Sequence, residues 1–277
     1  MDTNITFSGE TFAALGITAL LAVVIPVLAV IIYKKKVKDA WLPAVFIGAG
    51  TFFLFALILE SLLHVVMLPI IGDSVVWYVI YGSLAAGVFE ETGRFVAYKT
   101  LMKKHYTTKN SIMMGLGHGG FEAAFVIAAN MITYIALGML INSMGMDELL
   151  KLLGTAPDQV DAAVDQLSVA SGFTFVNVGL TIFERILAMT VHVCFSVWVY
   201  KAVSQKGKLW LYPAAILMHA AVDVFAALYQ KGVIGIPLMY IVFSASVVII
   251  VAITVLMVKK LPDRPELTAQ PDAKKEL

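Results

Sequence analysis

The sequence predicts an all-α fold, a polytopic transmembrane helical bundle of about seven helices. Of the 277 residues, 60 % are hydrophobic and 14 % are charged, with a mean hydropathy of +0.88. A soluble domain is about 45–50 % apolar and about 25 % charged. Each of seven apolar stretches is long enough to cross a bilayer, since a spanning helix needs about 20 residues. These observations exclude a soluble domain and indicate a multi-pass protein of the cell membrane, most simply the bacterial plasma membrane.

The seven stretches follow one another with short polar connections. The first is expected to be an uncleaved helix, because the opening "MDTNITFSGE" has no basic residues before the apolar run. The third and fourth are interrupted by polar residues. The expected helices are 10–33, 41–63, 75–100, 111–140, 173–200, 209–229 and 233–258.

The basic residues predict the orientation in the membrane. Thirteen Lys residues lie after the first, third, fifth and seventh stretches, in "YKKKVK", "KTLMKKHYTTK", "KAVSQKGK" and "VKK". The loops on the opposite side hold only Lys151 and Lys231. Because loops rich in Lys and Arg remain in the cytoplasm, we expect the N-terminus outside and the C-terminus inside.

We expect one transmembrane domain over residues 1–260 and a polar cytoplasmic tail over 261–277. The external loop 141–172 contains "DELLKLL" and "PDQVDAAVDQL", whose periodicity predicts two short amphipathic helices. This loop is interpreted as a surface cap on the bundle, with a gate over a substrate entrance as the alternative.

Ionisable residues interrupt the middle of the predicted bundle. A charge at the bilayer centre costs about 2.5–3.5 kcal/mol on the insertion scale, so such residues usually face a polar interior. At about 1.5 Å per residue, one residue from each of four helices lies roughly 12–15 Å from the cytoplasmic ends. This layer consists of Glu90 or Glu91, His118, His192 and His219. A deeper layer contains Glu122, Glu184, Arg185 and Asp223.

Spacing within the helices suggests how these side chains pair. His118 with Glu122, and His219 with Asp223, are four residues apart, so each acid can orient the ring of its histidine. Glu60 and His64 share this spacing and are interpreted as an interfacial pair at the outer boundary. Glu184 and Arg185 are adjacent, so each is expected to contact another helix.

Helix 75–100 carries two acids and one base within a turn. Arg94 can reach Glu90 or Glu91, which leaves one carboxylate over to act as a general base. The next helix contains "GLGHGG", in which Gly115 and Gly119 let another helix approach closely.

The pattern Glu-Glu-x-x-Arg, a glycine-flanked His and a later His-x-x-x-Asp resembles the glutamic intramembrane proteases. This family includes the type II CAAX prenyl endopeptidases and the bacterial CPBP proteins, and the most similar branch is the YhfC type. The resemblance implies that Glu90 activates water with help from His118, and that His219 and Asp223 stabilise the oxyanion. Glu91 and Arg94 would then hold the helix and tune the base.

Two departures from that family leave alternatives open. "EETGR" has two residues between the acids and Arg94, where the family usually has three, so either Glu90 or Glu91 is the base. His192 has no counterpart in the family, and three imidazoles at one depth suit Zn²⁺, with His118, His192 and His219 as ligands.

The sequence therefore predicts an intramembrane endopeptidase that hydrolyses peptide bonds of membrane-associated substrates with a glutamate-activated water and no metal. The alternatives are a zinc-dependent intramembrane metalloprotease with the same cluster, a proton-coupled transporter, or a haem-binding redox protein. Expected partners are the lipid bilayer and a peptide or membrane-protein substrate, and not a nucleic acid. The oligomeric state is left open. The supporting residues are Arg94, Glu122, Glu184, Arg185 and His192.

Overall fold

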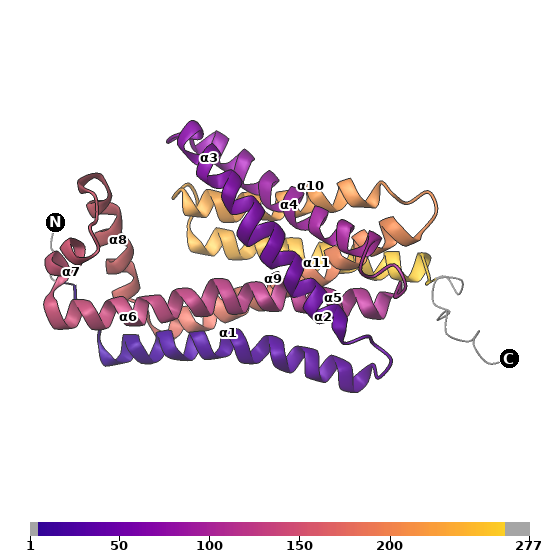
Figure 1. Cartoon of the computed structure of the whole chain (residues 1–277), viewed down its shortest axis with the longest axis horizontal. Coiled ribbons are helices and arrows are strands. Elements are labelled where there is room, and N and C mark those ends of the chain that lie inside the picture. Colours follow the sequence, from indigo (N-terminus) through magenta and orange to yellow (C-terminus); the bar gives the residue numbers. More distant parts are fainter. Residues whose placement is uncertain (1–4, 264–277) are drawn as a thin grey trace. The chain divides into compact units, whose positions relative to one another are not determined.

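A computed structural model describes residues 5–263, and this part of the chain is all-helical, with no strand. The helices are joined by short turns (Figure 1). In chain order they are α1 (Gly9–Lys36), α2 (Pro43–Thr51), η1 (Phe52–Glu60), α3 (Ser61–Ile71), α4 (Val75–Lys99), α5 (Thr108–Glu122), η2 (Ala123–Ala128), α6 (Ala129–Met144), α7 (Met146–Leu152), η3 (Pro157–Gln159), α8 (Val160–Ser171), α9 (Phe175–Ser204), α10 (Leu211–Gln230) and α11 (Ile236–Lys260).

Six segments of the described chain are long and apolar enough to cross a membrane. Each corresponds to a predicted stretch, which confirms the multi-pass helical fold. The remaining stretch forms the 25-residue helix α4, whose ionisable side chains lower its hydropathy. The six segments are Gly9–Lys36, Pro43–Ile71, Thr108–Met144, Phe175–Ser204, Leu211–Gln230 and Ile236–Lys260.

Two of these segments contain π-helical turns, at Phe52–Glu60 and Ala123–Ala128. A π-helical turn changes which side chains share a face, and such turns occur frequently at functional sites. The first of them joins α2 to α3 without a break, so the second membrane segment runs to Ile71. The apolar pattern alone predicts an end of this segment at residue 63.

The chain folds into two compact units, and it passes between them three times. One unit comprises residues 5–26 and 122–186, and the other comprises 27–121 and 187–263 within the described range. The single transmembrane domain expected over residues 1–260 stays a prediction. Most of the predicted cytoplasmic tail, residues 264–277, lies outside the described residues.

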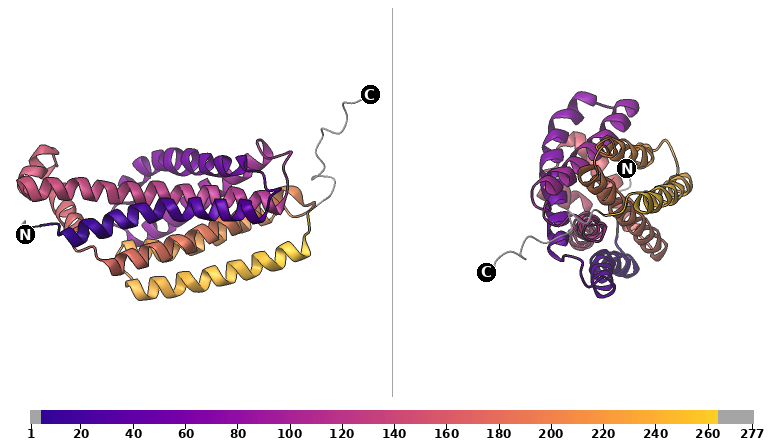
Figure 2. Two further views of the ribbon diagram at one scale, coloured as in Figure 1. Left: turned by 90° about the horizontal axis from the view of Figure 1, so that it is seen from below. Right: turned by 90° about the vertical axis from the view of Figure 1, so that its right-hand side faces the viewer.

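The unit of residues 27–121 and 187–263 is built around the contact between α4 and α10. These helices lie side by side (Figure 1), and α11 packs against α10 (Figure 2). Its buried core includes Tyr98 on α4, Met113 on α5, and Phe195 and Tyr200 on α9. Aromatic and sulfur-containing side chains therefore form much of this core.

Glycines let the backbones of α2, α5 and α9 approach closely. A Cβ added at Gly48 would lie 2.0 Å from the carbonyl oxygen of Met114, and one at Gly117 would lie 2.0 Å from that of Val45. A Cβ at Gly115 would lie 2.5 Å from Cα of Val193. The prediction that the "GLGHGG" glycines allow close helix approach is confirmed.

We expect Gly48→Ala to destabilise the protein by about 1–3 kcal/mol, as overpacking commonly does. The added methyl group meets backbone atoms, which cannot rotate out of the way. Gly50→Ala is the matched control on the same helix, because a Cβ there meets nothing within 4 Å. Chemical unfolding of both variants in detergent measures the difference, and equal stabilities would contradict the close packing of α2 on α5.

In the other unit, α7 and α8 fold back beside the end of α6 (Figure 1). They correspond to "DELLKLL" and "PDQVDAAVDQL", so the two predicted amphipathic helices are confirmed. Leu149 and Leu167 are buried on their inner faces. The backbone of Phe7 is anchored here by Asn142, whose side chain bonds both its amide and its carbonyl group.

The end of α11 is fastened to the start of α5 by Asp263. Its carboxylate accepts hydrogen bonds from the Thr108 amide and hydroxyl at 2.8 and 2.6 Å, from the Tyr200 hydroxyl at 2.9 Å and from Lys201 Nζ at 2.8 Å. Partial burial alone would raise the pKa of Asp263, but these donors outweigh it and hold the pKa below its usual range. Asp263 is therefore charged at neutral pH and closes this end of the unit.

Candidate metal and catalytic centre

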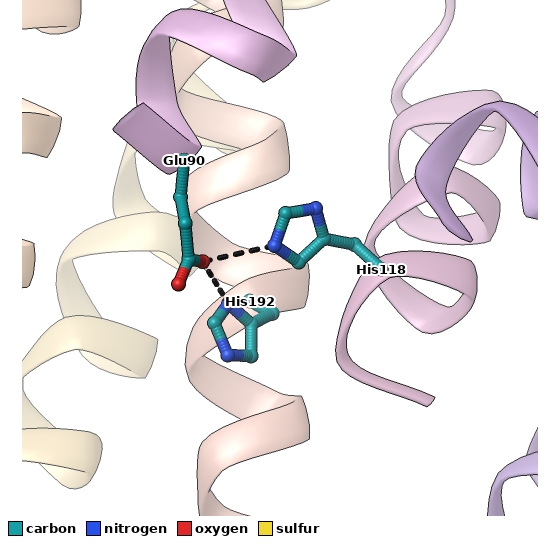
Figure 3. Close-up of side chains that lie close together, drawn as sticks. All are labelled: Glu90, His118 and His192. Carbon is teal, nitrogen blue, oxygen red and sulfur yellow. Dashed lines mark hydrogen bonds and ion pairs between the residues drawn. The ribbon is translucent and has the colours of Figure 1, made fainter. Parts of the chain in front are cut away.

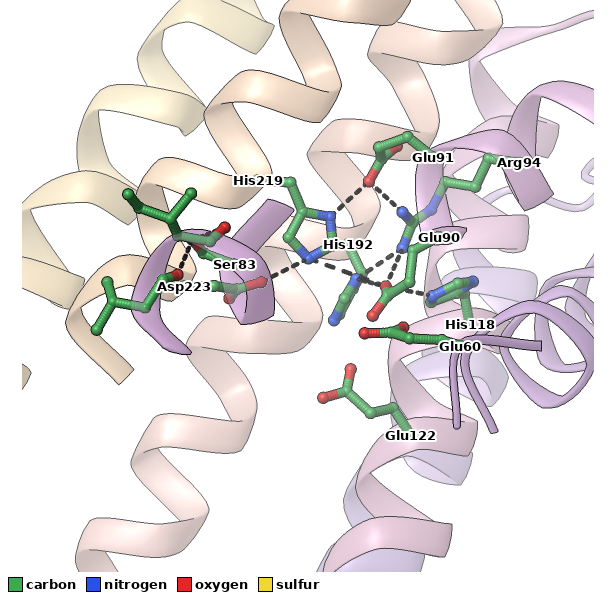
Figure 4. A network of polar contacts seen from close by, with 12 residues as sticks. Glu60, Ser83, Glu90, Glu91, Arg94, His118, Glu122, His192, His219 and Asp223 are labelled. Carbon is green, nitrogen blue, oxygen red and sulfur yellow. Dashed lines mark hydrogen bonds and ion pairs between the residues drawn. The ribbon is translucent and has the colours of Figure 1, made fainter. Parts of the chain in front are cut away.

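Four helices of one unit bring the predicted site residues together. Glu90, Glu91 and Arg94 come from α4, and one histidine each comes from α5, α9 and α10, with Asp223 one turn beyond the last (Figure 4). The predicted layer of one acid and three histidines therefore forms a real cluster. The side chains of Glu91, Arg94 and His118 are 0 % exposed, so the cluster lies inside the protein. Its members are Glu90, Glu91, Arg94, His118, His192, His219 and Asp223.

Glu90 Oε2 is the centre of the cluster. It lies 2.9 Å from His118 Nε2 and 3.5 Å from His192 Nδ1 (Figure 3). His219 Nε2 lies 3.9 Å from the same oxygen. Three imidazoles from three helices thus surround one carboxylate oxygen.

The orientation of the His118 ring is fixed by Thr51 on α2. The Thr51 hydroxyl donates to the Gly48 carbonyl at 2.6 Å, so its oxygen is left to accept a bond from His118 Nδ1 at 3.0 Å. Nδ1 of His118 therefore carries a proton. The lone pair of Nε2 in the neutral ring then faces the Glu90 carboxylate, and two acceptors at 2.9 Å require a shared proton or cation between them.

Glu122 had been predicted to orient His118, but both ring nitrogens of His118 face other groups. Glu122 instead accepts a bond from Arg185 at 2.9 Å, in the other unit. Arg185 also bonds the adjacent Glu184. The expectation that each of these two residues contacts another helix holds for Arg185, which bonds Glu122 on α5. Glu184 instead bonds the adjacent Arg185, because the long guanidinium reaches both acids.

Arg94 connects both acids with a histidine. Its Nη1 pairs with Glu91 Oε1, and its Nη2 lies 3.4 Å from Glu90 Oε2. Nη2 also donates to His192 Nδ1 at 2.7 Å. Arg94 was predicted to pair with one acid and leave the other free. It contacts both, with the closer contact to Glu91.

His219 is held between two carboxylates. Its Nδ1 donates to Glu91 Oε1 at 2.7 Å, and its Nε2 lies 3.4 Å from Asp223 Oδ2. The predicted four-residue pair of His219 and Asp223 is present. Asp223 is also the more exposed partner, at 32 % of its side chain, so it lies at the edge of the cluster.

Three of these residues have the spacing of a metal site. The candidate ligand atoms of Glu90, His118 and His192 all lie within 4.8 Å of one another, and all three residues are buried. Two ligands about 2.0–2.1 Å from a tetrahedral zinc lie about 3.3 Å apart, and the separations of 2.9 and 3.5 Å from Glu90 bracket that value. Two histidines and a glutamate are also a ligand set of catalytic zinc sites. The residues therefore fit a zinc ion, with Glu90 in place of the third histidine of the predicted set.

Two residues near the cluster were not recognised from the sequence. Nothing in the sequence pattern indicated that Thr51 contacts His118, because threonine is common in membrane helices. Glu60 does pair with His64, at 3.4 Å, as predicted. It is nevertheless only 7 % exposed and interacts electrostatically with Glu90, whereas the apolar pattern predicts a position at the membrane boundary.

Comparisons with known proteins bear directly on this cluster. The family model described as "YhfC intramembrane metalloprotease" matches residues 21–258. The chain is also 34 % identical over 252 residues to a protein of Bacillus subtilis (strain 168) described as "Uncharacterized membrane protein YhfC", which covers 89 % of this chain and 93 % of the relative. No solved structure matches the chain.

These matches do not extend to the CPBP proteins or the type II prenyl endopeptidases, so that wider relationship stays a prediction. The family description favours a metal-dependent reaction over the metal-free glutamate base. Three observations support the same family. They are the match over residues 21–258, the 34 % identity to the Bacillus subtilis protein and the buried cluster of Glu and His. The chain belongs to the YhfC intramembrane metalloprotease family.

Proposed function

We propose that this protein is an intramembrane metalloprotease that hydrolyses peptide bonds of membrane-associated substrates at the Glu90 cluster. The observation that carries the proposal is the group of Glu90, His118 and His192, whose ligand atoms lie within 4.8 Å of one another inside the unit. This metal-dependent mechanism is favoured over the metal-free glutamate mechanism, because the Glu90 carboxylate is positioned to act as a metal ligand.

Glu90, His118 and His192 would hold a zinc ion in this reaction. When bound, zinc lowers the pKa of a bound water to about 7 and polarises the carbonyl group of the peptide. Thr51 keeps Nε2 of His118 directed at the site through its contact with Nδ1 at 3.0 Å. Such outer contacts fix the tautomer and ring orientation of metal-binding histidines.

Arg94 and the metal compete for one nitrogen. Nη2 of Arg94 now donates to Nδ1 of His192 at 2.7 Å, so that nitrogen must be released before it can bind a metal. The contact of Nη1 with Glu91 does not involve His192 and holds the guanidinium in the cluster. Arg94 therefore offsets the negative charge of the two acids both with and without the metal.

His219 is the residue proposed to stabilise the oxyanion. Glu91 accepts the proton on Nδ1 at 2.7 Å and Asp223 lies 3.4 Å from Nε2. A protonated Nε2 can donate to the oxygen of a tetrahedral intermediate, and donors aimed at that oxygen are worth the most in a site of low dielectric constant. The substrate is a peptide segment within the bilayer and not a nucleic acid.

Proteolysis should depend on the metal. We expect the purified protein to cleave members of a pool of internally quenched peptides with apolar cores, to lose this activity in a strong chelator and to regain it when zinc is added. The measurement is the initial rate of fluorescence increase in detergent micelles. Full activity in the chelator would instead support the glutamate mechanism, and a zinc-loaded protein that cleaves nothing in the pool would contradict the protease assignment.

A further inference from the structure

A further acidic residue, Glu60, lies at the cluster and has no role in the mechanism so far. It ends the π-helical segment Phe52–Glu60 and is 7 % exposed. Its charge interacts with those of Glu90, His219 and Asp223, and Figure 4 shows its side chain close to Glu90 and His118. Burying a carboxylate without strong partners costs free energy. A functional role would explain why Glu60 is buried at this position.

The ion-pair partner of Glu60 in the described chain is His64, one turn further along. His64 Nε2 lies 3.4 Å from Glu60 Oε1, and its Nδ1 contacts the Tyr81 hydroxyl at 2.7 Å. The histidine thus has one nitrogen toward the buried acid and the other toward a hydroxyl on α4. A single imidazole joined on both sides can pass a proton from one side to the other.

His64 and Tyr81 both line a pocket of about 280 Å³ between α3, α4 and α10. Asp223 and Ser83 line the same pocket. One polar route joins the pocket to the cluster, from Asp223 to His219. A second route leads from the pocket through His64 to Glu60, whose charge interacts with the cluster. The pocket also includes Gln230, the last residue of α10, so it lies toward the helix ends that are predicted to face outside.

The remaining acids of the cluster are already engaged. Glu90 is a proposed metal ligand, and Glu91 is fully buried between Arg94 and His219. Asp223 faces Nε2 of His219. Glu60 lies beside the cluster, and its ion-pair partner among the described residues, His64, lines the pocket and does not belong to the cluster.

We propose that Glu60 is the catalytic carboxylate that moves the proton during peptide hydrolysis, with His64 and the pocket linking it to outside water. The inference rests on the proposed protease function. Glu60 takes a proton from water as the water oxygen bonds the carbonyl carbon and the carbonyl π electrons move to oxygen. The oxygen electron pair then re-forms the C=O bond as the C–N bond breaks, the C–N electron pair stays on nitrogen, and nitrogen takes the proton from Glu60. Water is thereby added across the bond, with OH on carbon and H on nitrogen.

The test compares Glu60→Gln with Glu148→Gln, an exposed acid in the other unit. Both zinc-loaded variants are assayed for zinc content, kcat and KM with a peptide that the wild type cleaves. We expect Glu60→Gln to keep the zinc content and KM of the wild type while kcat falls by about 10²–10⁴-fold, the usual contribution of a proton-transfer group. Glu148→Gln should match the wild type in all three.

Three results would overturn the role of Glu60. They are a kcat within a few-fold of the wild type, a loss of zinc, which would make Glu60 a ligand, and a loss of folding, which would make it a structural residue. Glu60→Asp and Glu60→Asn give a second comparison, because they have equal length and differ only in the carboxylate, and the Asp variant should be the more active. A wild type that cleaves no peptide contradicts the proposed function itself, so the two failures are distinguishable.

Discussion

Replacing His118 with alanine should abolish both metal binding and proteolysis. His118 Nε2 lies 2.9 Å from Glu90, and its Nδ1 is held by Thr51, so it is the best-oriented candidate ligand of the cluster. Thr51→Val should keep the ligand and lower metal affinity or activity by about 10–100-fold, as the loss of an outer contact usually does. Zinc titration and the peptide assay on both variants check this ranking.

The control for His118→Ala is His105→Ala, because His105 lies in the connection between α4 and α5, stacks on Trp41 and is outside the cluster. It should retain the zinc and the activity of the wild type. A His118→Ala protein that still binds one equivalent of zinc would show that the metal, if it acts at all, is bound elsewhere.

Arg94→Met should destabilise the protein more than any other substitution considered. The guanidinium is 0 % exposed and contacts Glu91, Glu90 and His192. Removing it leaves two buried carboxylates without their cation, and breaking a buried ion pair in this way costs about 3–5 kcal/mol. The measurement is the free energy of unfolding in detergent.

Lys99→Met is the matched control, because it removes one positive charge from the exposed end of the same helix. Its stability should stay within about 0.5 kcal/mol of the wild type, as for most surface substitutions. An Arg94→Met protein as stable as Lys99→Met would mean that the two acids are neutral or solvated, and the buried network would then be wrong.

The membrane helices could be predicted because long apolar stretches have a direct physical consequence for the backbone. Apolar stretches of sufficient length had to be helices, since a chain in lipid must satisfy its backbone hydrogen bonds internally. Depth along each helix also follows from a fixed rise per residue, which is why Glu90, His118, His192 and His219 were placed together. That these four side chains share one depth could therefore be predicted from the sequence.

Lateral neighbours could not be predicted in the same way. Glu122 and His118 share a helix face, yet Thr51 binds the ring and Arg185 binds the acid. The depth of a residue in the membrane does not predict which side chain of a neighbouring helix will form its hydrogen bond. Glu60 was misplaced because His64 and Pro69 interrupt the apolar pattern, whereas the helix continues to Ile71.

The central claim is that Glu90, His118 and His192 bind the metal that the reaction needs. X-ray absorption at the zinc edge, on protein purified with one equivalent of zinc, tests it most directly. The account predicts a shell of nitrogen and oxygen atoms at about 2.0–2.2 Å, with an imidazole signal that weakens when either His118 or His192 is replaced. A protein that retains no zinc, or a zinc shell unchanged in both histidine variants, would contradict it.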